Sequence, residues 1–326
     1  MNSTNQHSTK LIRRNPWLQL LRLPNLFTVP GDPIAGFLLV NIGWGIYNQD
    51  GEVYVSDALI FVLLAVLSSL LLYCSGLLAN DYFDLEEDRR ERPSRPLPSG
   101  RVRPESVILA ALVLALGGVG AAYLAGGRWT ALAAAILAGV IFFYDAVGKR
   151  IPVLGSITMG VCRGLSALIG AMAAWAGTMD AITIQMLLPA AGFIIGLTLY
   201  IAAVTSVSKK ETGADRVGLR RFLPVVAMFV WVVGTAACTL FGMIFWMPSV
   251  VLLILACGWT ISCAESLKGQ VQPGDVQRTV GKLIRALLLM QAAAAALVGL
   301  PGCIIAAVLL AFWPLSAIVG KRFYAS

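Results

Sequence analysis

Long apolar runs separated by short charged or turn-forming segments repeat along most of the chain. Each run is close to the ~20 residues that a helix needs to cross the ~30 Å hydrocarbon core of a bilayer. The runs cover residues 24–44, 57–79, 105–126, 129–147, 152–176, 182–207, 222–246, 248–264, 282–299 and 302–320. Because backbone polar groups cannot stay unpaired in lipid, the pattern predicts an all-α bundle of membrane helices. Only the Leu300-Pro301-Gly302 sequence marks the boundary between the last two runs, so these could form one kinked unit, and nine or ten spans are predicted.

Composition agrees with a membrane protein. Of the 326 residues, 58% are hydrophobic and 13% are charged. A soluble domain carries about 25% charged residues, so this chain has too little polar surface to cover a globule in water. The same values exclude a disordered chain, a coiled coil, a collagen and a secreted disulfide scaffold.

The basic residues indicate how the bundle is oriented. The net charge is +8, and all of the 25 Lys and Arg except Arg128 and Arg163 lie on one side of the predicted spans. Lys and Arg accumulate in cytoplasmic loops, so this side is expected to be cytoplasmic, with both termini on it. That arrangement needs an even number of spans and favours ten. It also explains the positive charge without a nucleic-acid partner.

These boundaries give a simple domain organisation. Residues 1–17 are polar and basic without an apolar core, so we expect no cleavable signal peptide. We expect a cytoplasmic segment at 1–23, one transmembrane domain at 24–320 and a tail at 321–326. The domain would carry cytoplasmic loops at 80–104 and 207–221 and lie in the cell inner (cytoplasmic) membrane.

Cysteine and histidine contribute little candidate chemistry. The 6 cysteines lie in or beside apolar runs without a CxxC pair, and the only histidine is His7. Zinc or haem ligation and a Ser-His-Asp or Cys-His nucleophilic site are therefore disfavoured. The chemistry is expected to come from the carboxylates.

Carboxylates crowd at the cytoplasmic end of the second span. If the helix continues there, Asn80, Asp84 and Asp88 recur at i, i+4 and i+8 and form one face within about 80° of arc. Three oxygen donors in a row at a membrane surface suit Mg²⁺, which is usually completed by water and a substrate phosphate. A solvated loop in which arginines neutralise the acids is the alternative interpretation.

A second acidic pair makes the metal-site interpretation stronger. Glu211 and Asp215 have i,i+4 spacing at the end of the sixth span, and Lys149 and Arg150 end the fourth span. Even-numbered spans end on the same side, so these groups open to the side that carries the first acidic motif. Two carboxylate sets with cations nearby can hold two Mg²⁺ ions and a diphosphate.

These residues resemble a known family. Residues 80–88 carry the pattern NDxxDxxxD, and residues 92–102 follow with the RPLPSG sequence. This composite resembles the first signature of the UbiA superfamily of intramembrane prenyltransferases. Residues 144–150 resemble its middle loop and residues 22–25 the start of its first helix, and the resemblance extends over residues 17–225.

The resemblance implies a helical bundle around a central cavity that is open to lipid. There a prenyl diphosphate would lose its Mg²⁺-bound diphosphate, and the prenyl group would alkylate a hydrophobic acceptor of aromatic or lipid-like character. Oligomeric state is left open. By position, the first Mg²⁺ would bind Asn80, Asp84 and Asp88, the second would bind Glu211 and Asp215, and the diphosphate would contact Arg22, Arg92, Lys149 and Arg150. Of these, Asp84, Asp88, Asp215 and Lys149 would be catalytic.

A second class of function stays open. A cation-coupled transporter or lipid carrier would also use acidic sites, but it is expected to place charges near the membrane midplane at broken helices. The acidic motifs lie instead at span ends, which favours the enzyme. Two charged residues fall inside predicted spans: Arg163, where a site role and a snorkelling role are both open, and Asp32, which is expected to mark a break near the cavity.

Overall fold

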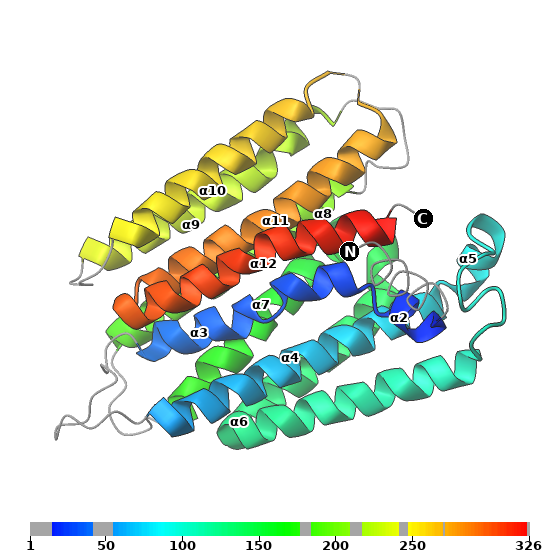
Figure 1. Cartoon of the computed structure of the whole chain (residues 1–326), viewed down its shortest axis with the longest axis horizontal. Coiled ribbons are helices and arrows are strands. Elements are labelled where there is room, and N and C mark those ends of the chain that lie inside the picture. The colour runs from blue at the N-terminus through cyan, green and yellow to red at the C-terminus, as the bar shows by residue number, and fades with distance from the viewer. Residues whose placement is uncertain are drawn as a thin grey trace, which may run out of the picture.

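The structure is a computed structural model, and it describes residues 15–41, 55–176, 184–208, 217–240, 247–269 and 271–324. Within them every regular element is a helix (Figure 1). The α-helices are α2 (Pro16–Leu20), α3 (Gly31–Asn41), α4 (Val55–Phe83), α5 (Leu85–Glu91), α6 (Pro104–Ala146), α7 (Pro152–Ala176), α8 (Ile184–Ser208), α9 (Leu223–Leu240), α10 (Met247–Ser266), α11 (Pro273–Ala296) and α12 (Leu300–Tyr324). Three short 3-10 helices are η1 (Leu23–Thr28), η2 (Gly148–Arg150) and η3 (Gly218–Phe222). The predicted all-α class is confirmed.

Helix α6 is a hairpin of two membrane-length halves. Its backbone leaves the helical region at Gly127, where φ is 74° and ψ is −159°. In the neighbouring α4, Ser75 donates to the Ala111 carbonyl at 2.7 Å, and a methyl group on Gly76 would lie 2.9 Å from the Ile141 side chain. Consecutive residues of α4 therefore meet both halves at one level, so the chain must reverse between them. The two halves match the spans predicted at 105–126 and 129–147.

The last two predicted spans are separate helices. Helices α11 and α12 pack against each other and are joined through Gly299, whose φ is 85°. A positive φ is accessible to glycine without steric cost, so the chain can turn sharply here. The single kinked unit considered above is therefore absent from this described part of the chain.

The helices qualify as membrane spans. Six of the described helices are long and apolar enough to cross a bilayer, with the 43-residue α6 counted once, and residues 26–40 and 300–316 form shorter apolar helices. Large apolar side chains such as Leu116 and Ile254 are more than 60% exposed on the outer surface. Such a surface is suited to lipid tails, and the protein is a multi-pass membrane protein.

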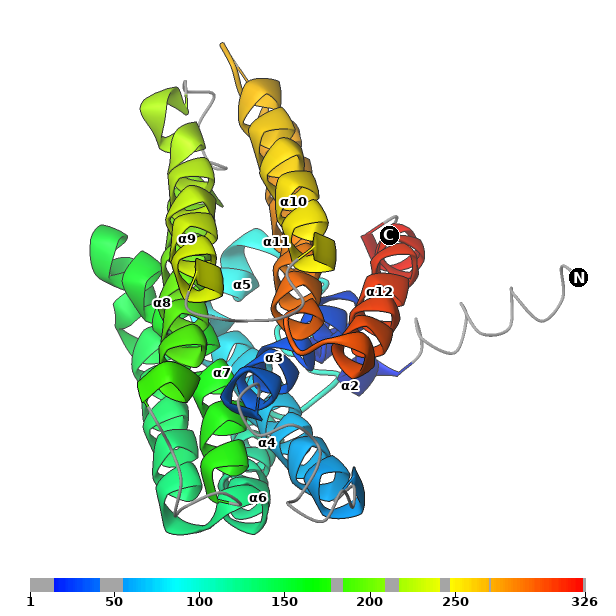
Figure 2. The same cartoon turned by 90° about the vertical axis from the view of Figure 1, so that its left-hand side faces the viewer.

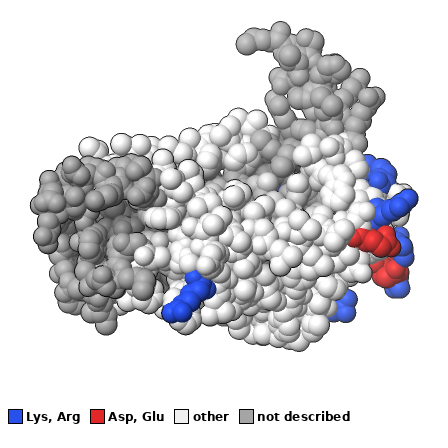
Figure 3. All heavy atoms as spheres, turned by 90° about the horizontal axis from the view of Figure 1, so that it is seen from below, with Lys and Arg blue, Asp and Glu red and all other residues white. Residues whose placement is uncertain are grey.

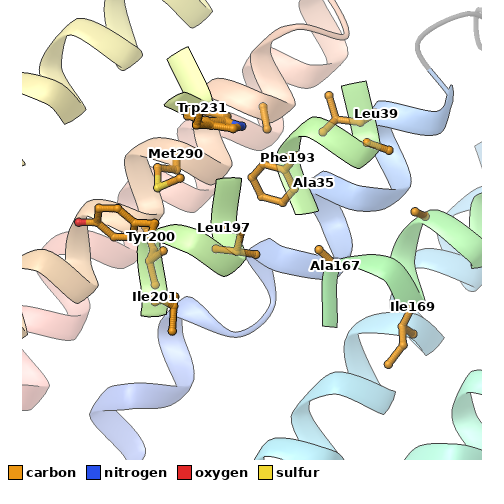
Figure 4. Packing of buried hydrophobic residues seen from close by; sticks show 14 of the residues in the cluster. Ala35, Leu39, Ala167, Ile169, Phe193, Leu197, Tyr200, Ile201, Trp231 and Met290 are labelled. Carbon is orange, nitrogen blue, oxygen red and sulfur yellow. The ribbon is translucent and has the colours of Figure 1, made fainter. Parts of the chain in front are cut away.

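Helix α7 lies at the centre of the bundle, where it contacts α3, α4, α6 and α8 (Figures 1 and 2). Small residues let these helices approach closely: a methyl group on Gly36 of α3 would lie 2.0 Å from the Ala167 carbonyl oxygen of α7. Close backbone approach of this kind is typical of membrane helix packing. Phe193, Trp231 and Met290 join α8, α9 and α11 in the same core (Figure 4).

One end of the molecule carries most of the charge. In Figure 3, acidic and basic side chains gather at the end where α5 projects in Figure 1. Helix α2 and the last turns of α12 lie toward the same end (Figure 1). This arrangement agrees with the predicted segregation of basic residues to one side.

Candidate functional site

The first acidic motif lies at the charged end, where α4 gives way to α5. Asn80 is in the last turn of α4, Asp84 stands between the two helices, and Asp88 is buried in α5. The Asp84 amide donates to the Asn80 carbonyl at 3.0 Å, and the Asp88 amide donates to the Asp84 carbonyl at 2.8 Å. These i to i−4 bonds carry the helical spacing across the break that ends α4 at Phe83, so the predicted register is kept.

Helix α5 is stabilised by its own charge pattern. Its first turn contains acidic residues, Asp88 among them, and its last turn contains Arg89 and Arg90. Acidic groups near the N-terminus and basic groups near the C-terminus interact favourably with the helix dipole. A seven-residue helix with almost no apolar side chains can therefore form at the membrane surface.

Lys149 is the cation that faces Asp84. Its ammonium lies 2.5 Å from an Asp84 carboxylate oxygen, and the two side chains are 15% and 22% exposed. Lys149 belongs to η2, which follows the second half of α6. The structure therefore brings together two predicted site residues from separate spans. Arg150, in the same short helix, is exposed.

Arg95 is the closest cation to Asp88. It donates from one guanidinium nitrogen to both carboxylate oxygens at 2.7 and 3.0 Å, whereas Arg92 stays 4.0 Å away and is 58% exposed. The loop that carries Arg95 is held by buried Leu97 and by Arg101, which donates to the Ser94 carbonyl at 2.9 Å. Arg92 was predicted to belong to the site and Arg95 was not, because two arginines in one loop give no sequence signal that separates them.

Asp81 is a carboxylate of the site that was not predicted from the sequence. It is 5% exposed, and its carboxylate lies 2.5 Å from Arg22 and 3.9 Å from Arg95. Arg22 directly precedes η1, so this ion pair joins the N-terminal segment to the first motif. The contact is made to Asp81, beside the residues of the i,i+4 pattern.

Asp145 completes the cluster from the end of α6. It is 3% exposed and accepts a hydrogen bond from the side-chain amide of Asn80 at 3.1 Å. The carbonyl oxygen of that Asn80 amide lies 3.5 Å from Arg22. An aspartate inside a run that is otherwise apolar was the available sequence signal for Asp145, and it went unused.

The cluster balances four carboxylates with four cations. The carboxylates are Asp81, Asp84, Asp88 and Asp145, and the cations are Arg22, Arg92, Arg95 and Lys149. Among the described residues, no three Asp, Glu, His or Cys side chains converge on one point as a preformed metal site. The donor set is nevertheless made of carboxylate and amide oxygens, the ligands that Mg²⁺ takes together with a substrate phosphate. The residues present therefore fit Mg²⁺ as a partner shared with a phosphorylated substrate.

The second acidic motif, Glu211 and Asp215, lies outside the described residues. The residues on either side of it are described: Val207 lies in the last turn of α8 and Val217 precedes η3, and both belong to one buried apolar cluster with Leu267 of the α10–α11 connection. Both ends of that segment are therefore anchored in one apolar cluster.

Asp32 and Arg163 form a buried ion pair inside the bundle. The Arg163 guanidinium lies 2.8 Å from the Asp32 carboxylate, and the Asp32 and Arg163 side chains are 0% and 10% exposed. Arg163 therefore does not snorkel to the membrane surface. Asp32 is at the start of α3, where the predicted break in the first span is confirmed.

The fold and this cluster define a polytopic α-helical membrane protein with facing acidic and basic groups at one end. Residues 38–278 match the UbiA prenyltransferase family, and the chain belongs to that family. A digeranylgeranylglyceryl phosphate synthase from Ignicoccus hospitalis is 34% identical over 164 residues, 49% of this chain and 48% of that protein. The chain thus spans about half the length of this curated relative.

Two solved structures share the fold. One, described as giving insights into the biosynthesis of digeranylgeranylglyceryl phosphate synthase in membranes, is 18% identical, with a TM-score of 0.61 and coverage of 87% of this chain and 98% of that one. The other is a UbiA homolog from Archaeoglobus fulgidus bound to DMAPP and Mg²⁺, 18% identical, with a TM-score of 0.52 and coverage of 88% and 100%. At these identities the likeness concerns the fold alone.

Proposed function

We propose that the protein is a Mg²⁺-dependent intramembrane prenyltransferase. It would move a prenyl group from a prenyl diphosphate to an aromatic or lipid-like acceptor and release diphosphate. The observation that carries this proposal is the cluster in which carboxylates of the first acidic motif face Arg22, Arg95 and Lys149 from three other segments of the chain. Family membership and the Mg²⁺ and DMAPP found in the Archaeoglobus fulgidus homolog support it.

An exchange of partners explains how balanced charges can bind a charged substrate. A Mg²⁺–diphosphate pair brings both signs of charge, so carboxylates can turn from a basic side chain to the metal while the basic side chain turns to the diphosphate. Asn80, Asp84 and Asp88 would take the first Mg²⁺, and Glu211 and Asp215 the second. Bound Mg²⁺ would neutralise the departing diphosphate and make it a better leaving group.

The basic residues would then do the electrostatic part of the reaction. When the bond between the prenyl carbon and the diphosphate oxygen breaks, its electron pair leaves with the diphosphate. Arg22, Arg92, Lys149 and Arg150 would receive this developing negative charge, and we add Arg95 because of its contact with Asp88. The acceptor would form the new bond to carbon and lose a proton, while the apolar bundle excludes water from the allylic cation.

The basic residues at the charged end of the bundle also indicate how the protein is oriented in the membrane. We infer that the charged end faces the cytoplasm and that the membrane is the cell inner membrane, because basic residues accumulate on cytoplasmic loops. The organisation proposed from sequence, one transmembrane domain at 24–320 between short terminal segments, is kept.

One observation favours the alternative function. The ion pair of Asp32 and Arg163 lies at a broken helix inside the bundle, which is where transporters place their ion sites. The two charges neutralise each other, however, so the pair offers no net charge to a transported cation. We therefore keep the transferase as the proposal.

The test is diphosphate release by purified protein in lipid, with a panel of prenyl diphosphates and acceptors and with or without Mg²⁺. We expect Mg²⁺-dependent release that is lost in Asp84→Ala and in Asp215→Ala. Asp275→Ala is the matched control, because Asp275 is an exposed aspartate of α11 that pairs with Arg278 at 3.4 Å. Release that is unaffected by Asp84→Ala would contradict the proposed metal site. Bound prenyl diphosphate without turnover across the panel would favour a carrier.

A further inference from the structure

The first membrane span is broken where η1 meets α3. The Asp32 amide donates to the Val29 carbonyl at 3.3 Å, so the pattern does not continue from Asp32 to Thr28 as it would in an α-helix. The Thr28 carbonyl instead accepts hydrogen bonds from two side chains of other helices, Arg163 of α7 and Gln291 of α11, each at 2.8 Å. Inside a bilayer a carbonyl at a helix break needs such partners.

The same two side chains also hold Asp32. Arg163 donates to one Asp32 carboxylate oxygen at 3.1 Å, and Gln291 donates to that oxygen at 2.6 Å. Asp32 and Gln291 are 0% exposed, and Arg163 is buried as well. We call Thr28, Asp32, Arg163 and Gln291 the hinge network. It joins three segments that are far apart in the sequence.

The hinge network is tightly packed. A methyl group on Gly31 would lie 2.1 Å from the Gln291 side-chain oxygen, and one on Gly170 would lie 1.9 Å from the Pro33 carbonyl oxygen. The start of α3 therefore lies directly against α7 and α11, at spacings that only glycine allows. Such close packing suits a fixed attachment point.

Stability alone is a weak reason for these charges. Replacing a buried ion pair by apolar side chains of similar volume is often neutral or stabilising, because desolvation offsets the attraction. Ionisable residues inside a membrane domain are rare and are by default candidates for function. What the Asp32–Arg163 pair does supply is a defined position for the end of η1.

The other end of η1 carries Arg22. This residue has φ 41° and ψ 54°, a left-handed conformation that is uncommon outside glycine. Such a backbone is strained for a residue with a side chain and persists only where its surroundings determine it. Arg22 lies 2.5 Å from Asp81 of the first acidic motif. Helix η1 is therefore fixed at one end by the hinge network and at the other by the acidic motif.

We infer that Asp32, Arg163 and Gln291 are positioning residues for the donor diphosphate: by fixing the inner end of η1, they hold Arg22 at the first acidic motif. This inference rests on the proposed function, in which Arg22 contacts the diphosphate. The hinge network itself does not touch the substrate and acts through the six-residue η1.

The first experiment measures this effect without any reaction. The double variant Asp32→Asn/Arg163→Met removes both charges together, so that no unpaired charge stays buried. Hydrogen exchange of peptides covering residues 20–32 is compared with the parent protein in lipid, with no substrate added. We expect exchange about tenfold faster, because η1 opens locally once Thr28 and residue 32 lose their bonds from Arg163 and keep only those from Gln291. Unchanged exchange would overturn the inference whether or not the protein transfers prenyl groups.

The second experiment is a double-mutant cycle on the KM for the prenyl diphosphate. Arg22→Met and the Asp32→Asn/Arg163→Met variant should each raise KM about tenfold, because the first removes and the second displaces a cation that binds the diphosphate. The triple variant should be no worse than Arg22→Met alone, because both changes remove one interaction. Additive effects would overturn the inference.

Ser249→Ala is the control for a buried polar residue of α10 that is 1% exposed and has no part in η1. We expect it to leave both KM and exchange unchanged. A parent protein without any turnover would refute the proposed function, while the exchange measurement would still decide on the hinge network.

Discussion

Asn80 and Asp145 are joined by a hydrogen bond of 3.1 Å from the side-chain amide of Asn80 to the carboxylate of Asp145. The bond fixes the plane of the Asn80 amide and leaves its carbonyl oxygen 3.5 Å from a guanidinium nitrogen of Arg22. That oxygen is the atom that would bind Mg²⁺. Asp145 therefore acts on the proposed metal site through Asn80, as outer-shell partners orient metal ligands in other proteins.

A substitution at Asp145 should weaken the response to Mg²⁺. Asp145→Leu removes the acceptor, and we expect the Mg²⁺ concentration for half-maximal diphosphate release to rise about ten- to a hundredfold. Asp145→Asn keeps an acceptor oxygen and should shift it much less. Equal Mg²⁺ responses in the parent and the Asp145→Leu variant would show that Asn80 is oriented by other means.

Arg92 and Arg95, the two arginines just after α5, should differ in their effect on stability. Arg95→Met leaves the buried Asp88 carboxylate without its nearest partner, and we expect a loss of about 1–3 kcal/mol, moderated by the partial exposure of Arg95. Arg92→Met removes a contact of 4.0 Å from an exposed side chain and should cost no more than about 0.5 kcal/mol. Thermal unfolding in one detergent measures both. A larger loss in Arg92→Met would contradict the assignment of Arg95 to Asp88.

The helices were predictable from sequence, because lipid imposes a length and a composition on every span. The hairpin of α6 was predictable for the same reason: an apolar run of 43 residues is too long for one crossing, and Gly127 marks the place to turn. The prolines on either side of Asp32 indicated the break after Thr28. Spans, turns and breaks of this kind depend only on residues that are close together in the sequence.

The partners of the site residues were less predictable, because they come from different helices. Asn80 meets Asp145, and Asp81 meets Arg22, only once α4 has packed against α6 and the N-terminal segment. The apolar pattern fixes which residues are buried in a span but not the rotation of one helix against another. The choice between Arg92 and Arg95 likewise depends on how one loop folds on itself.

The turn in α6 should require glycine at position 127. Its φ of 74° and ψ of −159° lie in a region that is essentially restricted to glycine, so Gly127→Ala should cost about 1–3 kcal/mol of stability. Gly120→Ala is a matched control in the same helix, because a methyl group at either site would meet no atom within 4 Å. Only the backbone conformation differs between the two. We expect a lower unfolding temperature for Gly127→Ala alone, and equal temperatures would show that the turn tolerates side chains.

Removal of Lys149 should have opposite effects on the two ligands. Asp84 pairs with Lys149 at 2.5 Å, so the lysine and Mg²⁺ compete for the same carboxylate. A partly exposed ion pair worth about 1 kcal/mol changes an equilibrium about fivefold. In Lys149→Met the Mg²⁺ concentration for half-maximal diphosphate release should therefore fall about fivefold. The KM for the prenyl diphosphate should rise, because a cation that binds the leaving group is lost. Lys149→Arg keeps the charge and is the control. If both ligands bound more weakly in Lys149→Met, the exchange of partners at Asp84 would be refuted and Lys149 would be a structural partner of the first motif.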